Sequence, residues 1–316
     1  MRTKRKVSGK SYVPVSGKKS FRKQVPFLVM LAFPMLYFAV FKYLPMFGLA
    51  MAFQNYKTGA PFIGFDAQWV GLQWFRQLFQ NPFFGRLVRN TLLLSIYYLT
   101  CSFPFSIFLA LLLNEIRKSW LRRFTANITL LPYFISTVVI VGVMFNFFSV
   151  DGGLVNNVIK NMGGDTIDFM GSYQYFRSLY VGSGIWQNVG FDAVVFTAAI
   201  AGIDPAYYEA AALDGSTRLK NILYITLPCI MPTIITMLLL KLGSLMSVGY
   251  EKIILMYSPA IYETADVLST YAYRAGILDR KVSLATAIGL INSVVNLLLL
   301  LAANRFSRKV SETSLW

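Results

Sequence analysis

The sequence predicts an all-α membrane protein, and two observations lead to that prediction. Hydrophobic residues make up 56% of the 316 residues and charged residues only 14%, whereas a typical soluble domain carries about 25% charged residues. Several apolar runs also reach the roughly 20 residues that a helix needs to cross a bilayer. These runs lack the two-residue alternation of barrel strands, so helices remain the one way to satisfy the backbone in lipid.

Six spanning helices are predicted along the chain. The first follows a basic block and is not followed by a cleavage pattern of small residues, so it reads as a span and not as a signal peptide. The predicted spans cover residues 25–44 (with apolar character continuing to 53), 90–114, 124–148, 179–201, 230–248 and 283–303.

The spans form one transmembrane domain, residues 25–303, between a basic N-terminal tail (1–24) and a C-terminal tail (304–316). The connections 149–178 and 250–282 are rich in Gly, Asn, Asp and aromatic residues. We expect both connections to hold short helices that lie along the membrane surface, where aromatic side chains gather.

The distribution of basic residues predicts the orientation. Nine Lys and Arg residues and no acidic residue occupy the first 24 positions. The tails and loops on that side of the predicted bundle hold eighteen basic residues, against ten on the other side. Cytoplasmic loops are enriched in Lys and Arg, so both termini are predicted to be cytoplasmic. The net charge of +16 is therefore explained without a nucleic-acid partner, and membrane lipid is the surrounding partner.

Composition excludes several kinds of chemistry. The chain has no histidine, which rules out His-based catalysis and His-ligated metals within it. Its two cysteines, Cys101 and Cys229, lie in or beside apolar runs and suggest neither a disulfide nor a metal site. The sequence predicts no catalytic residue, no metal site and no cofactor in this chain.

The most informative segment lies between the fourth and fifth predicted spans, at residues 204–228. Asp204 and Pro205 are a capping acid and a proline at the first helical position, which predict a helix start. Good helix formers follow, and Gly215 ends them. A second short helix is expected before Pro228, which marks the entry into the fifth span. The prediction is a helix–turn–helix on the cytoplasmic face.

This segment resembles the hallmark of the permeases of binding-protein-dependent ABC importers. That hallmark is Glu-Ala-Ala, three residues, Gly, nine residues and Ile-x-Leu-Pro. The chain matches it at every fixed position, which are Glu209, Ala210, Ala211, Gly215, Ile225, Leu227 and Pro228. An ordinary interfacial amphipathic helix is the alternative for the same segment.

The resemblance implies a fold, a role and partners. The fold is that of a type I importer permease, and the first short helix docks on an ATPase subunit. Glu209 would make a charged contact there, Ala210 and Ala211 would allow close approach, and Gly215 would provide the bend. The candidate coupling residues are thus Glu209, Ala210, Ala211, Asp214, Gly215, Leu227 and Pro228.

The implied assembly contains a second, homologous permease subunit, two ATPase subunits and an extracellular substrate-binding lipoprotein. The chain itself lacks a nucleotide-binding Gly-rich lysine loop, so ATP and Mg²⁺ would be bound by the partner ATPase. The location implied is the bacterial plasma (inner) membrane. No enzymatic step is expected in this chain.

Further stretches resemble the oligosaccharide permeases related to the maltose system, in a branch common in Gram-positive bacteria. They lie at residues 248–253, 266–274, 285–290 and 314–316. The implied cargo is a carbohydrate. A non-sugar solute is the alternative within the family. A membrane-embedded glycosyltransferase would need an Asp-x-Asp motif, and an ion channel would need repeated filter loops. The sequence contains neither.

Polar residues inside the spans are candidates for the substrate pathway. Ionisable groups in spans are costly and usually meet a partner or a cavity, so Asp192 and Lys241 are expected either to pair or to line the path. Buried amides more commonly join helices, but amides and aromatic faces also suit a sugar. The candidates are Trp186, Gln187, Asn188, Asp192, Lys241, Asn292 and Asn296.

The orientation gives a direct test. Single cysteines at Lys10 and Thr313 are expected to react with a membrane-impermeant thiol reagent only from the cytoplasmic side, because both termini face inward. The measurement is labelling in intact cells compared with inside-out vesicles. Labelling of either position from outside in intact cells would overturn the predicted count of six spans.

Overall fold

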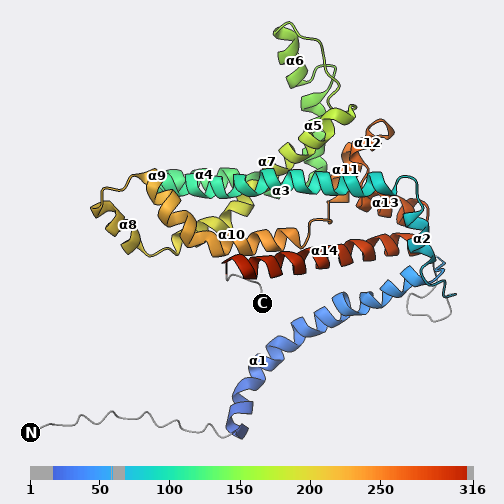
Figure 1. Ribbon diagram of the computed structural model, residues 1–316, viewed down its shortest axis with the longest axis horizontal. Coiled ribbons are helices and arrows are strands. Elements are labelled where there is room, and N and C mark those ends of the chain that lie inside the picture. The colour runs from blue at the N-terminus through green and yellow to red at the C-terminus, as the bar shows by residue number, and fades with distance from the viewer. Residues whose placement is uncertain (1–16, 58, 60–67, 312–316) are drawn as a thin grey trace, which may run out of the picture.

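The computed structural model describes residues 17–57, 59 and 68–311, and the described chain is built from helices joined by short connections (Figure 1). Most of the basic tail predicted at residues 1–24 lies outside the described residues. The same holds for Lys10, Thr313 and the end of the tail at 312–316. Helix α14 (Val282–Ser311) continues from the sixth predicted span into the predicted C-terminal tail.

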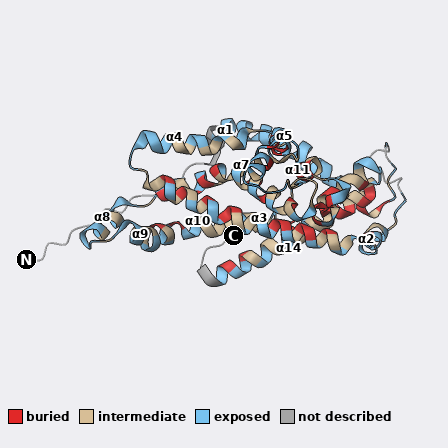
Figure 2. Ribbon diagram, turned by 90° about the horizontal axis from the view of Figure 1, so that it is seen from above, coloured by how far each residue is buried: buried red, intermediate tan, exposed pale blue. Residues whose placement is uncertain are grey.

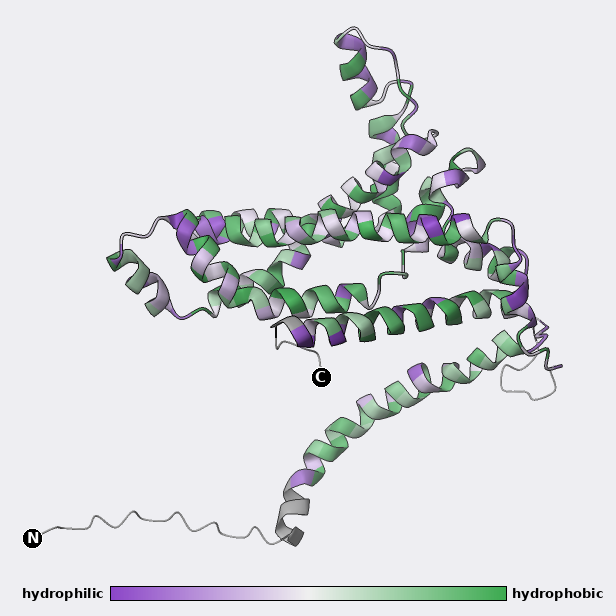
Figure 3. Ribbon diagram, viewed as in Figure 1, coloured by the Kyte–Doolittle hydropathy of each residue, from purple (hydrophilic) through white to green (hydrophobic). Residues whose placement is uncertain are grey.

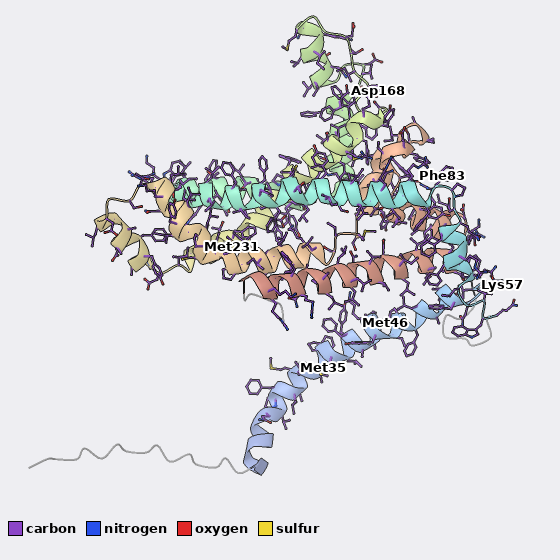
Figure 4. All side chains as sticks on the ribbon, viewed as in Figure 1. Met35, Met46, Lys57, Phe83, Asp168 and Met231 are labelled. Atoms are coloured by element: carbon purple, nitrogen blue, oxygen red, sulfur yellow. The ribbon has the colours of Figure 1, made fainter. Side chains whose placement is uncertain are left out.

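The first apolar run is a long segment that leaves the bundle. It consists of α1 (Gly17–Phe38), the π-helical η1 (Ala39–Tyr43) and the 3-10 helix η2 (Leu44–Phe53). The labelled Met35 and Met46 lie on this splayed segment and are both exposed (Figure 4). The η2 end packs against α14, while most of the segment is exposed, so this apolar segment needs lipid or another subunit around it.

Four long helices form the body of the bundle. They are α3 (Phe84–Glu115), α7 (Tyr173–Ala201), α10 (Leu227–Leu242) and α14. Buried residues gather along these helices, whereas α8 and α9 at one end are exposed (Figure 2). Phe103 of α3 meets Phe196 of α7 edge to face, with ring centroids 5.8 Å apart, a favoured aromatic geometry.

The close approach of α7 to the helix before the bend, α4 (Ser119–Leu130), depends on one glycine. Gly190 of α7 is buried, and a Cβ at this position would clash with the backbone carbonyl of Thr129 in α4. A larger residue would therefore push α4 away from α7, because packed interiors absorb extra volume poorly.

The predicted third span, 124–148, is wrong as a single helix. Helix α4 runs through η3 (Leu131–Phe134) and then meets α5 (Thr137–Phe148) at 96°. Pro132 ends the α-helical pattern, and the backbone is extended at Ser136, whose hydroxyl accepts a hydrogen bond from the Val139 amide at 3.4 Å. The break is thus a helix stop followed by an N-cap.

The predicted fifth span, 230–248, also needs correction at its C-terminal end. Helix α10 ends at Leu242, and residues 243–246 form a turn that leads into an irregular segment. Asn296 of α14 holds this turn, since its Oδ1 accepts from the Met246 amide at 2.8 Å and its Nδ2 donates to Ser247 Oγ at 2.9 Å.

The expected short helices are present in both long connections. Helix α6 (Leu154–Asn161) lies in the first, and the second holds α11 (Tyr250–Met256), η5 (Pro259–Ile261), α12 (Tyr262–Ala265), α13 (Leu268–Tyr273) and η6 (Arg274–Leu278). Helices α2 (Gln73–Phe79) and α13 lie at the end of the bundle opposite α8 (Figure 1). The buried Asp266 carboxylate accepts two hydrogen bonds of 2.8 Å from Arg274, which ties this region together.

Within the described residues, four helices are long and apolar enough to cross a membrane, and the number rises to six if each bent pair is one span. The second bent pair joins α7 to α8 (Pro205–Leu213) at 68°. Apolar residues run along α1, α3, α10 and α14 (Figure 3). The fold is an all-helical membrane fold with four to six candidate spans.

Candidate functional site

The helix–turn–helix predicted at residues 204–228 forms, and its first helix is capped at both ends. Asp204 is the N-cap of α8, with Oδ1 accepting from the Ala206 amide at 2.9 Å, and Pro205 follows at the first helical position. At the other end Gly215 has φ +70°. A glycine adopts this left-handed conformation without strain.

The turn at Gly215 satisfies the last carbonyls of α8. The Ser216 amide donates to the Ala211 carbonyl at 2.9 Å, and the Gly215 amide donates to the Ala212 carbonyl at 3.1 Å. These two bonds define a Schellman motif. The sequence prediction of a helix from Asp204 to a break at Gly215 is therefore confirmed.

A continuous helical run carries the chain from this turn into the bundle. It contains α9 (Arg218–Asn221), the π-helical η4 (Ile222–Thr226) and α10. Pro228 stands in the first turn of α10. Leu227 is half-buried, so this end of the hallmark packs on the bundle.

Two contacts connect the exposed helices to the long ones. The hydroxyls of Tyr208 in α8 and Thr226 in η4 are 2.9 Å apart. Arg218 Nη1 of α9 lies 3.8 Å from Glu115 Oε2 at the end of α3. A displacement of α8 would therefore reach both α10 and α3.

Helix α8 itself presents a free surface. Glu209, Ala210, Asp214 and Gly215 are exposed and Ala211 is half-buried. Leu213 keeps 91% of its surface exposed. Figure 1 shows α8 and α9 protruding at one end of the bundle.

The structure brings Asp192 and Lys241 together. Lys241 Nζ of α10 donates to Asp192 Oδ2 of α7 at 2.8 Å, with side-chain exposures of 25% and 15%. The pairing considered from the sequence thus forms, and it joins two spanning helices. Lys241 also lines a cavity, so pairing and lining are compatible.

That cavity, called here the central cavity, lies between α3, α7, α10, the turn at 243–249 and α11. Its volume is about 270 Å³, just below the roughly 300–1,000 Å³ of small-molecule sites. The polar lining residues are Ser95, Tyr98, Tyr180, Gln187, Asn188, Lys241, Ser244, Ser247 and Lys252.

Three of the seven pathway candidates line the central cavity, namely Gln187, Asn188 and Lys241. Asp192 does not line the cavity but forms an ion pair with Lys241, which does.

The remaining candidates lie elsewhere. Trp186 lines a separate, mostly apolar groove between α5 and α7. Asn296 holds the turn after α10, which matches the interhelical role considered from the sequence. The Oδ1 atom of Asn292 is buried and has no hydrogen-bond partner in the described part of the chain.

Sequence reasoning missed Tyr98, Tyr180 and Lys252 as lining residues. The Tyr98 hydroxyl donates a hydrogen bond to the Gly184 carbonyl at 3.4 Å and accepts one from Asn188 Nδ2 at 3.3 Å. Lys252 lies in the stretch 248–253, which resembles the oligosaccharide permeases. The signal for a buried lysine at this position is the apolar run Ile-Ile-Leu-Met that follows it. No sequence signal marked the two tyrosines among eighteen.

The class that this architecture defines is a helical membrane permease, and comparison with known proteins gives the family. Residues 102–312 match the family model described as "Binding-protein-dependent transport system inner membrane component". The chain therefore belongs to this family. It is a multi-pass inner-membrane permease of an ABC importer and not an enzyme, as the sequence predicted.

Individual relatives agree over nearly the whole chain. Protein LplB of Bacillus subtilis (strain 168) is 40% identical over 93% of this chain and 92% of its own. The polygalacturonan/rhamnogalacturonan transport system permease protein YteP of the same organism is 39% identical over 89% and 87%.

A solved bacterial ABC transporter, involved in import of the acidic polysaccharide alginate, contains a similar chain. That chain is 42% identical with TM-score 0.84, over 93% of this chain and 98% of its own. The similarities confirm the prediction of a permease in the carbohydrate branch of ABC importers.

The ion pair gives a test of stability. Lys241→Met leaves the Asp192 carboxylate unpaired, and breaking a buried pair from one side costs about 3–5 kcal/mol, less here because both side chains keep some exposure. We expect a reduced yield of folded protein by size-exclusion chromatography in detergent. Adding Asp192→Asn is expected to restore the yield.

The double variant decides the origin of any loss. Restored yield shows that the unpaired carboxylate was the costly group. A single variant that folds at wild-type yield would show that the pair does not stabilise the bundle.

Proposed function

We propose that this permease and a second, homologous permease subunit together form the path of an oligosaccharide through the membrane. An extracellular binding lipoprotein delivers the sugar, and two ATPase subunits bind ATP and Mg²⁺ on the cytoplasmic side. The chain crosses the membrane six times, with both termini inside. The bent pair α4–α5 would supply the third crossing and α7 the fourth, with α8 turned away from α7 at the cytoplasmic side.

The observation that carries the proposal is the exposed, doubly capped α8 at one end of the bundle (Figure 1). A helix of nine residues is too short to be stable alone, yet its caps hold it rigid without burial. Rigidity and exposure together suit a docking element. Glu209, Ala210, Ala211, Asp214 and Gly215 would contact the ATPase.

In the proposed mechanism, ATPase closure displaces α8 as a unit. The Tyr208–Thr226 and Arg218–Glu115 contacts pass the displacement to α10 and α3. Both helices line the central cavity, so the cavity opens alternately to either side, a rigid-body form of switching. Leu227 and Pro228 anchor the moving segment to α10.

The central cavity is proposed as part of the sugar path. Tyrosine faces, amides and hydroxyls converge on it, and sugars are bound by apolar walls with a few placed polar groups. The names of two relatives support a carbohydrate, since one is a transporter of alginate and the other of polygalacturonan/rhamnogalacturonan. A non-sugar solute is the rival within the family.

Two substitutions in α8 test the coupling role. Glu209→Lys reverses the charge offered to the ATPase, and Gly215→Pro fixes φ near −65° where the turn needs +70°. We expect both variants to insert in the membrane and to lose, by about tenfold or more, ATP-driven uptake of oligosaccharide into proteoliposomes. Binding-protein-stimulated ATP hydrolysis should fall with it.

A matched control is Glu251→Lys, which reverses the charge of an exposed residue at the start of α11, away from α8. Wild-type stimulation in both α8 variants would mean that this loop does not couple the subunits. Failure of the wild-type complex to import any sugar would refute the proposed function.

A further inference from the structure

Two lysines line the central cavity, and within the described part of the chain only one of them has a counter-ion. Lys241 is paired with Asp192 at 2.8 Å. Lys252 of α11 is 8% exposed, and its Nζ has no hydrogen-bond partner among the described residues. Its recorded contact is the ring of Tyr180, with the centroid 5.3 Å from Nζ. The cavity therefore carries one uncompensated positive charge.

A buried amine without a carboxylate is costly, because desolvation penalises the charged form. Burial lowers the pKa of Lys252, which lies outside the candidate spans, to about 8. The amine is still mostly protonated at neutral pH. Ser95, whose Oγ also has no partner in the described chain, lines the same cavity.

Buried polar atoms without partners are few in folded proteins, and each needs an explanation. Here two of them line one cavity. Both can donate a hydrogen bond, and one is cationic. A carboxylate accepts hydrogen bonds at both oxygens and carries the opposite charge. The remaining lining, the faces of Tyr98 and Tyr180 and the amides of Gln187 and Asn188, suits the sugar ring that would carry such a group.

We propose that Lys252 is a specificity-determining residue that binds the carboxylate of an acidic sugar, a uronate unit of the cargo, in the central cavity. This inference rests on the proposed function, since it names the class of oligosaccharide that uses the path. A neutral sugar would leave the Lys252 charge buried and unpaired, so the site discriminates against it.

The experiment uses the assembled importer in proteoliposomes with its own binding protein. The probes are tetramers of galacturonate, mannuronate and guluronate, each beside its carboxyl-reduced neutral counterpart. The wild-type complex is expected to import at least one acidic tetramer and to prefer it to the neutral counterpart. Lys252→Met should reduce that uptake by about tenfold or more. Lys252→Arg, which keeps the charge, should retain most of it.

Folding and selectivity controls separate a binding role from a structural one. Lys252→Met and Lys252→Gln remove an unpaired buried charge, so both should melt at or above the wild-type temperature. Lys160→Met, on the exposed surface of α6, is the matched control and should import the acidic tetramer normally. Because all variants share one binding protein, a change in selectivity belongs to the permease.

The inference is overturned if Lys252→Met imports the acidic tetramer at the wild-type rate. It is also overturned if the wild-type complex imports only neutral sugars, a result that leaves the proposed sugar import intact. A melting temperature well below wild type in both Lys252→Met and Lys252→Gln would assign the lysine a structural role. Import of no sugar at all would refute the proposed function itself.

Discussion

The constraint on which this structure depends is that hydrocarbon neither hydrogen-bonds a backbone nor solvates a charge. Every long element is therefore a helix, and the helix breaks bring their own polar partners. Ser136 caps the chain after the bend at Phe134, and Asn296 holds the turn after Leu242. The charges of Asp192 and Lys241 neutralise each other between two helices. Within this pattern Lys252 stands out, because its Nζ contacts the Tyr180 ring but has no hydrogen-bond partner in the described chain.

The same constraint explains how motion could pass through the molecule. Polar contacts between helices connect particular elements. Helix α8 is linked to η4 through Tyr208 and Thr226, and the following helix α9 is linked to α3 through Arg218 and Glu115. The largely exposed Arg218–Glu115 pair is worth at most about 1 kcal/mol, so in the proposed mechanism the covalent path through η4 would carry most of the displacement. The central cavity lies between helices at the end of both links.

Much of this fold could be predicted from the sequence, because lipid leaves few alternatives to an apolar run. The capped helix at Asp204–Gly215 was predictable from local chemistry alone, since proline, a capping acid and glycine act at fixed positions. The 96° bend was not seen, because a long apolar run hides a break whose signals are only Pro132 and Ser136. The end of α10 at Leu242 was missed because the partner that holds the turn, Asn296, is distant in sequence.

The candidate site divides in the same way. The pairing of Asp192 with Lys241 could be predicted as possible from the sequence, because the rise per residue of a helix places both residues at a similar depth in the membrane. The contribution of Tyr98, Tyr180 and Lys252 depends on how α3, α7 and α11 pack, which a single sequence does not encode in any local pattern. The polar residues Trp186 and Asn296 share the composition of a sugar site but face other surroundings.

The most direct test of the account is a contact measurement at α8. A photo-crosslinking amino acid at Leu213, which is 91% exposed in the isolated chain, would be introduced into the assembled importer in membranes. The account predicts a crosslink to the ATPase subunit whose yield changes when ATP is added. Crosslinking to lipid or to the binding protein, with none to the ATPase, would contradict it.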